Sequence, residues 1–335
     1  ADDTAPLDAQ LFWSNGSSDY VAAESKALAR TRLGAVQGRN STLSLVPPVA
    51  LPEGDFALAV QTVFVDPAYA EPDVSWCEPD GDASSPAANA GAFGAKRNSR
   101  IKADATRLAN EHRVPVKVVW NREATVRWGK KRPPLAIALH PDGSGIIRVG
   151  VTPQSDDLSE LLGVVRSVVP EVTIELVEIL GPPVGATHRG AILSELLAAR
   201  AVLGAERGAP VSVTSPNGAR ASVSFDGVAF SAHVYAGDPL CSTTLRSYVA
   251  GSLHQAFSMV TSEGIAINDN GEPVDLTVRS FGVVPSAGTP PMNITIEDSN
   301  DTSVAAGGAV FAAALAAVWL WDGGTTWPTR RKETR

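Results

Sequence analysis

The sequence is poor in cysteine. Only Cys77 and Cys241 occur, and no Cys-x-x-Cys pair exists. Two cysteines cannot build the disulfide framework of a small secreted domain, so we expect reduced thiols in a cytoplasmic protein. No charged segment followed by an apolar one marks a secretory signal. Because the chain starts with Ala rather than Met, we expect a processed N-terminus.

Charged and aromatic residues are also scarce, at 19% and 6%, and the net charge is −8. No basic stripe interleaved with aromatic residues is present, which argues against nucleic-acid binding. The basic runs at residues 130–132 and 329–332 lie beside prolines, and we expect them to be solvated segment ends. The low charge predicts that another chain covers part of the surface.

One long uncharged run covers Val304 to Trp321. It meets the length of about 18 residues at which a membrane span is considered. Alanine and glycine contribute little transfer energy, however, and the Gly307-Gly308 pair is expected to precede the helix. A buried core helix over residues 309–321 is therefore favoured over a membrane anchor.

Several common catalytic motifs are missing. The sequence contains no Walker A motif, no Gly-x-Gly-x-x-Gly fingerprint and no Gly-x-Ser-x-Gly elbow. Its histidines are scattered and do not pair with other ligands at metal-site spacing. We expect surface positions or satisfied hydrogen bonds for all of them: His112, His140, His188, His233 and His254.

Three regions are expected: a weakly patterned segment over residues 1–55 with a helix at 20–30, a first domain over 56–133, and a second domain over 134–335. The boundary follows from Arg132-Pro133-Pro134. The first domain is expected to contain, in order, a strand, a Pro-rich loop, a glycine turn, a helix and a strand. Their ranges are 56–65, 66–91, 91–94, 100–113 and 114–120.

The second domain alternates hairpins with helices. Turns at residues 141–143 and 226–227 predict two hairpins. Helices are expected at 156–169, 191–204 and 243–260, and further strands at 172–180, 274–284 and 292–298. The fold class that follows is α+β, with mixed sheets, hairpins and packed helices, and not a doubly wound parallel sheet.

The order of several short motifs resembles a known family. "GAFGAK" (91–96) is followed by a helix and by "PVKVVWNREATV" (115–126). "VDPAYAEPD" (65–73) precedes the glycine turn, and "AGDPLCSTTLRSYVAGSLHQAFSMVTSEGIAINDNGEPVD" (236–275) is the most similar segment. Together they resemble the molybdenum-binding subunit of the xanthine dehydrogenase and aldehyde oxidase family, over about residues 56–330.

The resemblance implies an oxidoreductase that hydroxylates an aldehyde, a purine or an N-heterocycle with oxygen from water. It implies molybdenum on a molybdopterin, plain or in the cytosine dinucleotide form, held by this chain or shared with another. A 2Fe-2S subunit and an FAD subunit are the implied partners, with a longer molybdenum-type chain as a further one. Contacts with the cofactor are implied for Gly91, Ala92, Phe93, Gly94, Gln154 and Thr187.

Glycine at positions 91 and 94 would let backbone amides approach the cofactor, because glycine has no side chain in the way. The alternative is a simple turn into a helix. The family's glutamate, its general base, corresponds to Gly308, which cannot accept a proton. The chain is also shorter than family subunits. Both departures keep a second interpretation open, a non-catalytic scaffold or assembly subunit of such a complex.

Overall fold

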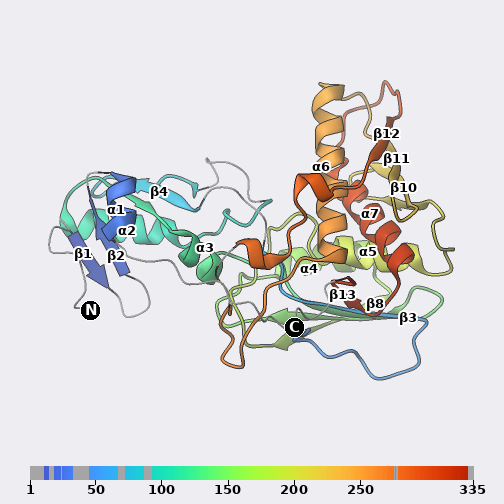
Figure 1. Ribbon diagram of the computed structural model, residues 1–335, viewed down its shortest axis with the longest axis horizontal. Coiled ribbons are helices and arrows are strands. Elements are labelled where there is room, and N and C mark those ends of the chain that lie inside the picture. Colours follow the sequence, from blue (N-terminus) through green and yellow to red (C-terminus); the bar gives the residue numbers. More distant parts are fainter. Residues whose placement is uncertain are drawn as a thin grey trace.

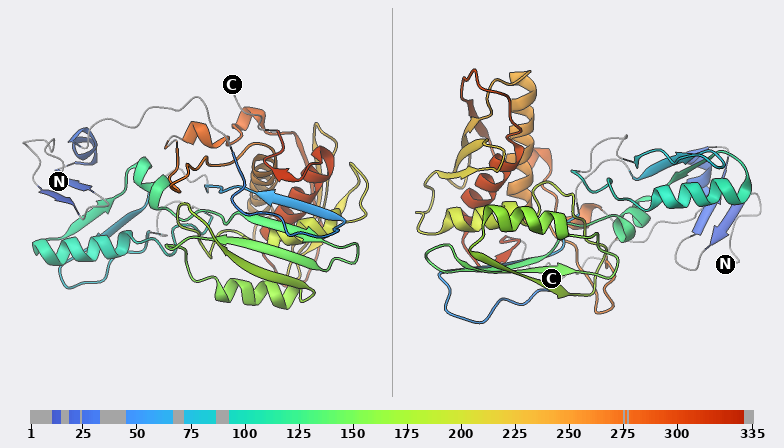
Figure 2. Two further views of the ribbon diagram at one scale, coloured as in Figure 1. Left: turned by 90° about the horizontal axis from the view of Figure 1, so that it is seen from below. Right: turned by 180° about the vertical axis from the view of Figure 1, so that it is seen from behind.

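The computed structural model describes residues 11–14, 19–23, 25–32, 45–66, 72–86, 93–274, 276 and 278–330. These residues form a large body and a smaller lobe, which lie side by side in all views (Figures 1 and 2). The site described below lies where segments of the two meet.

A five-stranded sheet forms the floor of the body. Its strand order is β13-β3-β6-β7-β8, with β3 at Leu58–Thr62, β6 at Leu135–Leu139, β7 at Gly145–Val151, β8 at Val172–Glu178 and β13 at Thr326–Trp327. All residues of β6 are buried, as expected for an apolar run in the middle of a covered sheet. Helix α4 (Ser159–Val168) covers one face and the remaining body helices cover the other (Figure 2).

A four-stranded sheet, of order β12-β11-β10-β9, forms the second half of the body. Its strands are β9 (Val211–Thr214), β10 (Arg220–Phe225), β11 (Phe230–Tyr235) and β12 (Met292–Ile296). Burial alternates along β9 and β11, because one face packs on helices and the other meets solvent. Both predicted hairpins, β6–β7 and β10–β11, are confirmed as antiparallel pairs.

Helices α5 (Leu193–Val202), α6 (Ser242–Thr261) and α7 (Gly307–Asp322) fill the space between the two sheets. Helix α7 is buried from Ala309 to Trp319 and packs against α5, α6, β9 and β10. The prediction of a core helix is therefore confirmed. Within the described part of the chain, no helix combines the length and apolarity needed to cross a bilayer.

The lobe packs helix α2 (Ile101–His112) on the antiparallel pair of β4 (Val74–Cys77) and β5 (Val116–Val119). The apolar positions of α2 that gave the helical spacing, Ile101, Ala105, Leu108 and Ala109, are its buried face. Helix α3 (Arg122–Trp128) follows β5. The N-terminal elements lie at the same end of the molecule as the lobe (Figures 1 and 2): β1 (Leu11–Ser14), β2 (Asp19–Ala22) and α1 (Lys26–Arg32).

The α+β fold class is confirmed, but three local predictions are wrong. The helix expected at 20–30 is divided between β2 and α1, and the loop expected at 66–91 contains β4. The strand expected at 274–284 contains the short 3-10 helix η2 (Val278–Phe281), and another, η3 (Ser286–Gly288), follows it. The five-stranded sheet also crosses the expected boundary at residue 133, because β3 pairs with β6. Strand pairing between distant segments is invisible to local periodicity.

Candidate functional site

Six separate segments of the chain line one cavity of ≈ 50 Å³. Phe93 comes from the lobe, Gln255 and Met259 from α6, and Phe311 from α7. The remaining wall is rich in ionisable groups and consists of Val65, Asp66, Arg132, His188, Arg189 and Glu263. Apolar side chains thus line a small space that also contains buried charge.

The predicted glycine turn reaches this cavity. Phe93 has φ +51° and Gly94 has φ +99°. The backbone oxygen of Phe93 accepts a hydrogen bond from Arg189 N at 2.8 Å, and Gly94 O accepts one from Thr187 Oγ1 at 2.8 Å. A Cβ on Gly94 would lie 1.6 Å from Thr187 O. Position 94 must therefore be glycine, because the turn lies directly against the backbone of Thr187.

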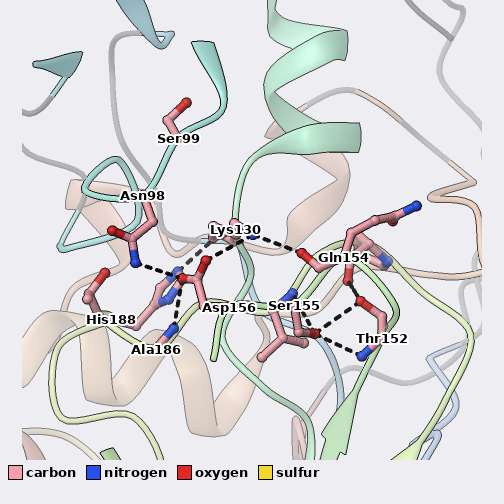
Figure 3. Close-up of polar contacts among 12 residues, drawn as sticks. Asn98, Ser99, Lys130, Thr152, Gln154, Ser155, Asp156, Ala186 and His188 are labelled. Atoms are coloured by element: carbon pink, nitrogen blue, oxygen red, sulfur yellow. Dashed lines mark hydrogen bonds and ion pairs between the residues drawn. The ribbon is translucent and has the colours of Figure 1, made fainter. Parts of the chain in front are cut away.

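The structure brings together Phe93, Gly94 and Thr187, whereas Gly91 and Ala92 lie outside the described residues. Gln154 is exposed and is not part of the cavity wall. Its backbone oxygen accepts a hydrogen bond from Lys130 Nζ at 2.8 Å (Figure 3). The structure therefore does not place the side chain of Gln154 at the cavity.

Asp156, two residues further on, links the body to the turn at residues 93–99, which we call the lobe turn (Figure 3). One carboxylate oxygen pairs with Lys130 Nζ at 3.0 Å. The other accepts hydrogen bonds from Asn98 Nδ2 at 3.3 Å and from Ala186 N at 3.1 Å. This carboxylate fixes the loop that carries Thr187 and Arg189 against the turn that carries Phe93.

Lys131 and Arg132 of the basic run at residues 130–132 are buried, so the prediction of a solvated segment end is wrong there. Lys131 Nζ pairs with Asp66 Oδ2 at 2.9 Å, and these side chains are 0% and 8% exposed. Arg132 forms a two-point ion pair with Glu195 of α5, in which Nη2 donates to Oε2 at 2.8 Å. The two carboxylates come from distant segments, so the sequence did not reveal this burial.

Arg189 has a different environment. Its Nη1 donates to Ser252 Oγ at 3.2 Å and to Gln255 Oε1 at 3.1 Å, and its guanidinium lies 5.0 Å from the centroid of the Phe93 ring. Among the described residues, no carboxylate lies within ion-pair distance of this group. Burial, together with the charge of Arg132, lowers the pKa of Arg189, but a guanidinium remains charged in proteins.

Three other titratable groups of the cavity are perturbed. Burial raises the pKa of Glu263 to about 7, and burial also raises the pKa of Asp66. The pKa of His188 falls to about 3, mainly because of burial and then because of the charge on Arg132. Neutral His188 donates from Nε2 to Lys130 O at 3.1 Å. The buried Nδ1 of His188 has no hydrogen-bond partner among the described residues, so the expectation of a satisfied histidine is met at only one of its two nitrogens.

We predict that Glu263→Gln stabilises the protein at high pH. A glutamate with an unfolded pKa near 4.5 and a folded pKa of about 7 contributes stability below pH 4.5 that is lost as the pH rises to 7. The variant should therefore gain about 3 kcal/mol over the parent at pH 8 relative to pH 4.5, at about 1.4 kcal/mol per pKa unit. Urea denaturation at the two pH values measures the gain.

The matched control is Glu206→Gln, which changes an exposed carboxylate. The free energy of unfolding of this control should differ from that of the parent by the same amount at pH 4.5 and at pH 8. If Glu263→Gln behaves in the same way, Glu263 titrates as an ordinary carboxyl group. His188 contributes a pH dependence of the opposite sign, because its lowered pKa stabilises the fold above pH 6.5 and this stabilisation is lost as the pH falls. The parent and both variants contain His188, so its contribution cancels when their free energies of unfolding are compared.

Gly308 lies in the first turn of α7, three residues before Phe311 of the cavity wall. A Cβ at this position would meet no atom within 4 Å, so a larger residue would fit. The carboxylates that line the cavity are instead Asp66 and Glu263. Sequence reasoning missed these two and Arg189. Asp66 stood in the acidic-Pro segment before the glycine turn, and Glu263 stood in the similar segment at residues 236–275, but neither was singled out.

No protein-family model matches the sequence, and no curated protein matches it in sequence. Solved structures do match in fold. Quinoline 2-oxidoreductase from Pseudomonas putida 86 is 9% identical, with 92% of this chain and 84% of that chain covered and a TM-score of 0.63. The Cu,Mo-CO dehydrogenase is 8% identical, with 82% and 75% covered and a TM-score of 0.61.

An aldehyde oxidoreductase from Desulfovibrio desulfuricans ATCC 27774 is 12% identical, with 81% of this chain and 60% of that chain covered and a TM-score of 0.59. At such low identities the likeness establishes the fold alone. The chain therefore has the α+β fold of these solved enzymes.

Proposed function

We propose that the chain is a subunit of a molybdenum hydroxylase that oxidises an aldehyde, a purine or an N-heterocycle with oxygen from water. One observation supports this most directly. In a fold shared with oxidoreductases, the Phe93–Gly94 turn, the loop at residues 187–189 and α7 converge on one cavity. The first two of these are segments for which the sequence resemblance implied cofactor contacts.

The described residues fit only one edge of a molybdopterin. Pockets that enclose a whole ligand of this size measure about 300–1,000 Å³, whereas the cavity measures ≈ 50 Å³. The ring of Phe93 and the cationic Arg189 would face that edge, since the cofactor is flat and anionic. When bound, the molybdenum would accept the electrons of the oxidation. Another chain would complete the pocket around the cofactor, in its plain or cytosine dinucleotide form.

The partners in this proposal are a 2Fe-2S subunit, an FAD subunit and a longer molybdenum-type chain. The first two would carry electrons away, and the third would supply the carboxylate that position 308 lacks. A cytoplasmic location is part of the same proposal. It agrees with the state of the two cysteines, since Cys77 and Cys241 are both free thiols.

Gly308 favours a second candidate function, a scaffold or assembly subunit that holds no cofactor. A general base near a reacting group contributes about 10²–10⁴ in rate, and α7 offers no carboxylate where the family has its glutamate. In this case the lobe and the body would only organise neighbouring subunits.

We expect Phe93→Ala to lower the molybdenum and pterin content of the purified complex severalfold, because the flat wall beside the cofactor is removed. Metal analysis and the fluorescence of oxidised pterin measure the content. Trp76→Ala, which changes a 44% exposed side chain of the lobe, is the control and should have no effect. Unchanged content in Phe93→Ala would favour the scaffold, and a complex without molybdenum would contradict the proposal.

A further inference from the structure

Among the described residues, one cation in the wall of the cavity has no counter-ion. The charge of Arg132 is balanced by Glu195 and that of Asp66 by Lys131. Arg189 and Glu263 remain, and Glu263 has a pKa of about 7. Below pH 7 the wall therefore has a net positive charge at Arg189. A partly buried cation is costly unless an anion accompanies it.

The guanidinium of Arg189 is held in place with free donors. Both of its hydrogen bonds, to Ser252 Oγ and Gln255 Oε1, use Nη1, which leaves Nε and Nη2 without an acceptor in the described residues. These two groups form the edge that binds a carboxylate at two points. The partners of Nη1 are neutral and lie on α6, so they orient the group without neutralising it.

The size and lining of the cavity limit what can bind there. One water requires about 10–15 Å³ of such volume, so a cavity of ≈ 50 Å³ admits about four non-hydrogen atoms. Val65, Met259 and Phe311 form an apolar part of the wall. These features suit a short carboxylate whose tail is a methyl group.

We propose that this cavity binds a small monocarboxylate of acetate size, with its oxygens on Nε and Nη2 of Arg189 and its tail toward the apolar wall. This site needs neither molybdenum nor a partner chain, and it goes beyond the proposed function. A short organic acid would thereby control access to the space beside Phe93.

Binding should weaken as Glu263 ionises, because a second negative charge then shares the cavity. Most of the other ionisable groups near this space are held in ion pairs. Arg132, Lys131 and Glu195 are locked in ion pairs, Asp66 is paired with Lys131, and His188 stays neutral because its pKa is about 3. Tyr248 also lies close enough to Arg189 to influence its charge. With a pKa of about 7 for Glu263, affinity should fall about tenfold from pH 6 to pH 8.

The test is titration of the full chain, alone or in its complex, with 13C-labelled acetate followed by NMR line broadening at pH 6. Acetamide, the neutral analogue of the same shape, is the second probe. We expect acetate to bind and acetamide not to bind. Arg189→Gln should weaken acetate at least about tenfold, since a charge-assisted pair is worth about 1.5–3 kcal/mol.

Arg207→Gln is the matched control, because Arg207 is an exposed arginine stacked at 4.3 Å on Trp321, at the far end of α7. It should leave acetate binding unchanged. Arg189→Lys keeps the charge, and its thermal midpoint and that of Arg189→Gln show whether each variant is folded. Equal binding of acetate and acetamide, or full binding by a folded Arg189→Gln, would overturn the proposal.

Glu263→Gln should bind acetate at pH 6 as the parent does and should retain that affinity at pH 8. A persistent pH dependence in this variant would overturn the role of Glu263. Molybdenum is quantified in the same samples. Because a bound cofactor edge would occupy the same cavity, acetate binding is scored in samples without molybdenum. Binding there supports the anion site whatever becomes of the proposed function, and no binding there refutes the anion site alone.

Discussion

Gly94→Ala is expected to lower the free energy of unfolding by about 3 kcal/mol or more, and to detach the lobe turn from the body. The added Cβ would lie 1.6 Å from Thr187 O, a backbone atom that cannot move aside alone. Strain at positive φ and an overpacked contact each cost about 1–3 kcal/mol. Chemical denaturation measures the loss, and hydrogen exchange at Arg189 N reports the turn, because its acceptor is Phe93 O.

Two glycines separate the causes of this loss. Gly218 also has a positive φ, +86°, but a Cβ there would meet no atom within 4 Å, so Gly218→Ala measures backbone strain alone. Gly163 lies inside α4 with open space around it, and Gly163→Ala should stabilise the helix by about 1 kcal/mol. A Gly94→Ala variant no less stable than Gly218→Ala would show that the approach to Thr187 is not close.

Arg132→Met is expected to cost about 3–5 kcal/mol, because it leaves a buried carboxylate without its cation. That carboxylate belongs to Glu195, whose side chain is 1% exposed. The double variant Arg132→Met/Glu195→Met removes both charges and should recover most of the loss, since two apolar side chains can fill the same space. Denaturation of the two single variants and the double variant gives the coupling energy.

The control is Arg113→Met, which breaks the pair with Asp80 between side chains that are 64% and 70% exposed. Water already screens this pair, so stability should barely change. If Arg132→Met is equally harmless, Glu195 must find another partner or become protonated. A double variant as unstable as the single one would show that methionine does not pack in the space of the ion pair.

Local sequence patterns were enough to predict most of the helices and strands. An uncharged run predicted the buried helix α7, and turn residues at 141–143 and 226–227 predicted both hairpins. Helical spacing also identified the buried face of α2. These predictions succeed because periodicity and turn chemistry act between residues that are close in sequence. Predictions failed at β4 and at residues 274–284, where strand pairing and packing override local preference.

The sequence by itself determined that Phe93, Gly94 and Thr187 belong to one region, through the order of motifs that carry the resemblance. Only the tertiary structure decided why Gly94 must be glycine, since the backbone that excludes a Cβ is that of Thr187. It also decided that Lys131 and Arg132 are buried, and that Arg189 and Glu263 face one cavity. Charge and burial depend on neighbours in space, and these neighbours come from segments that no local pattern connects.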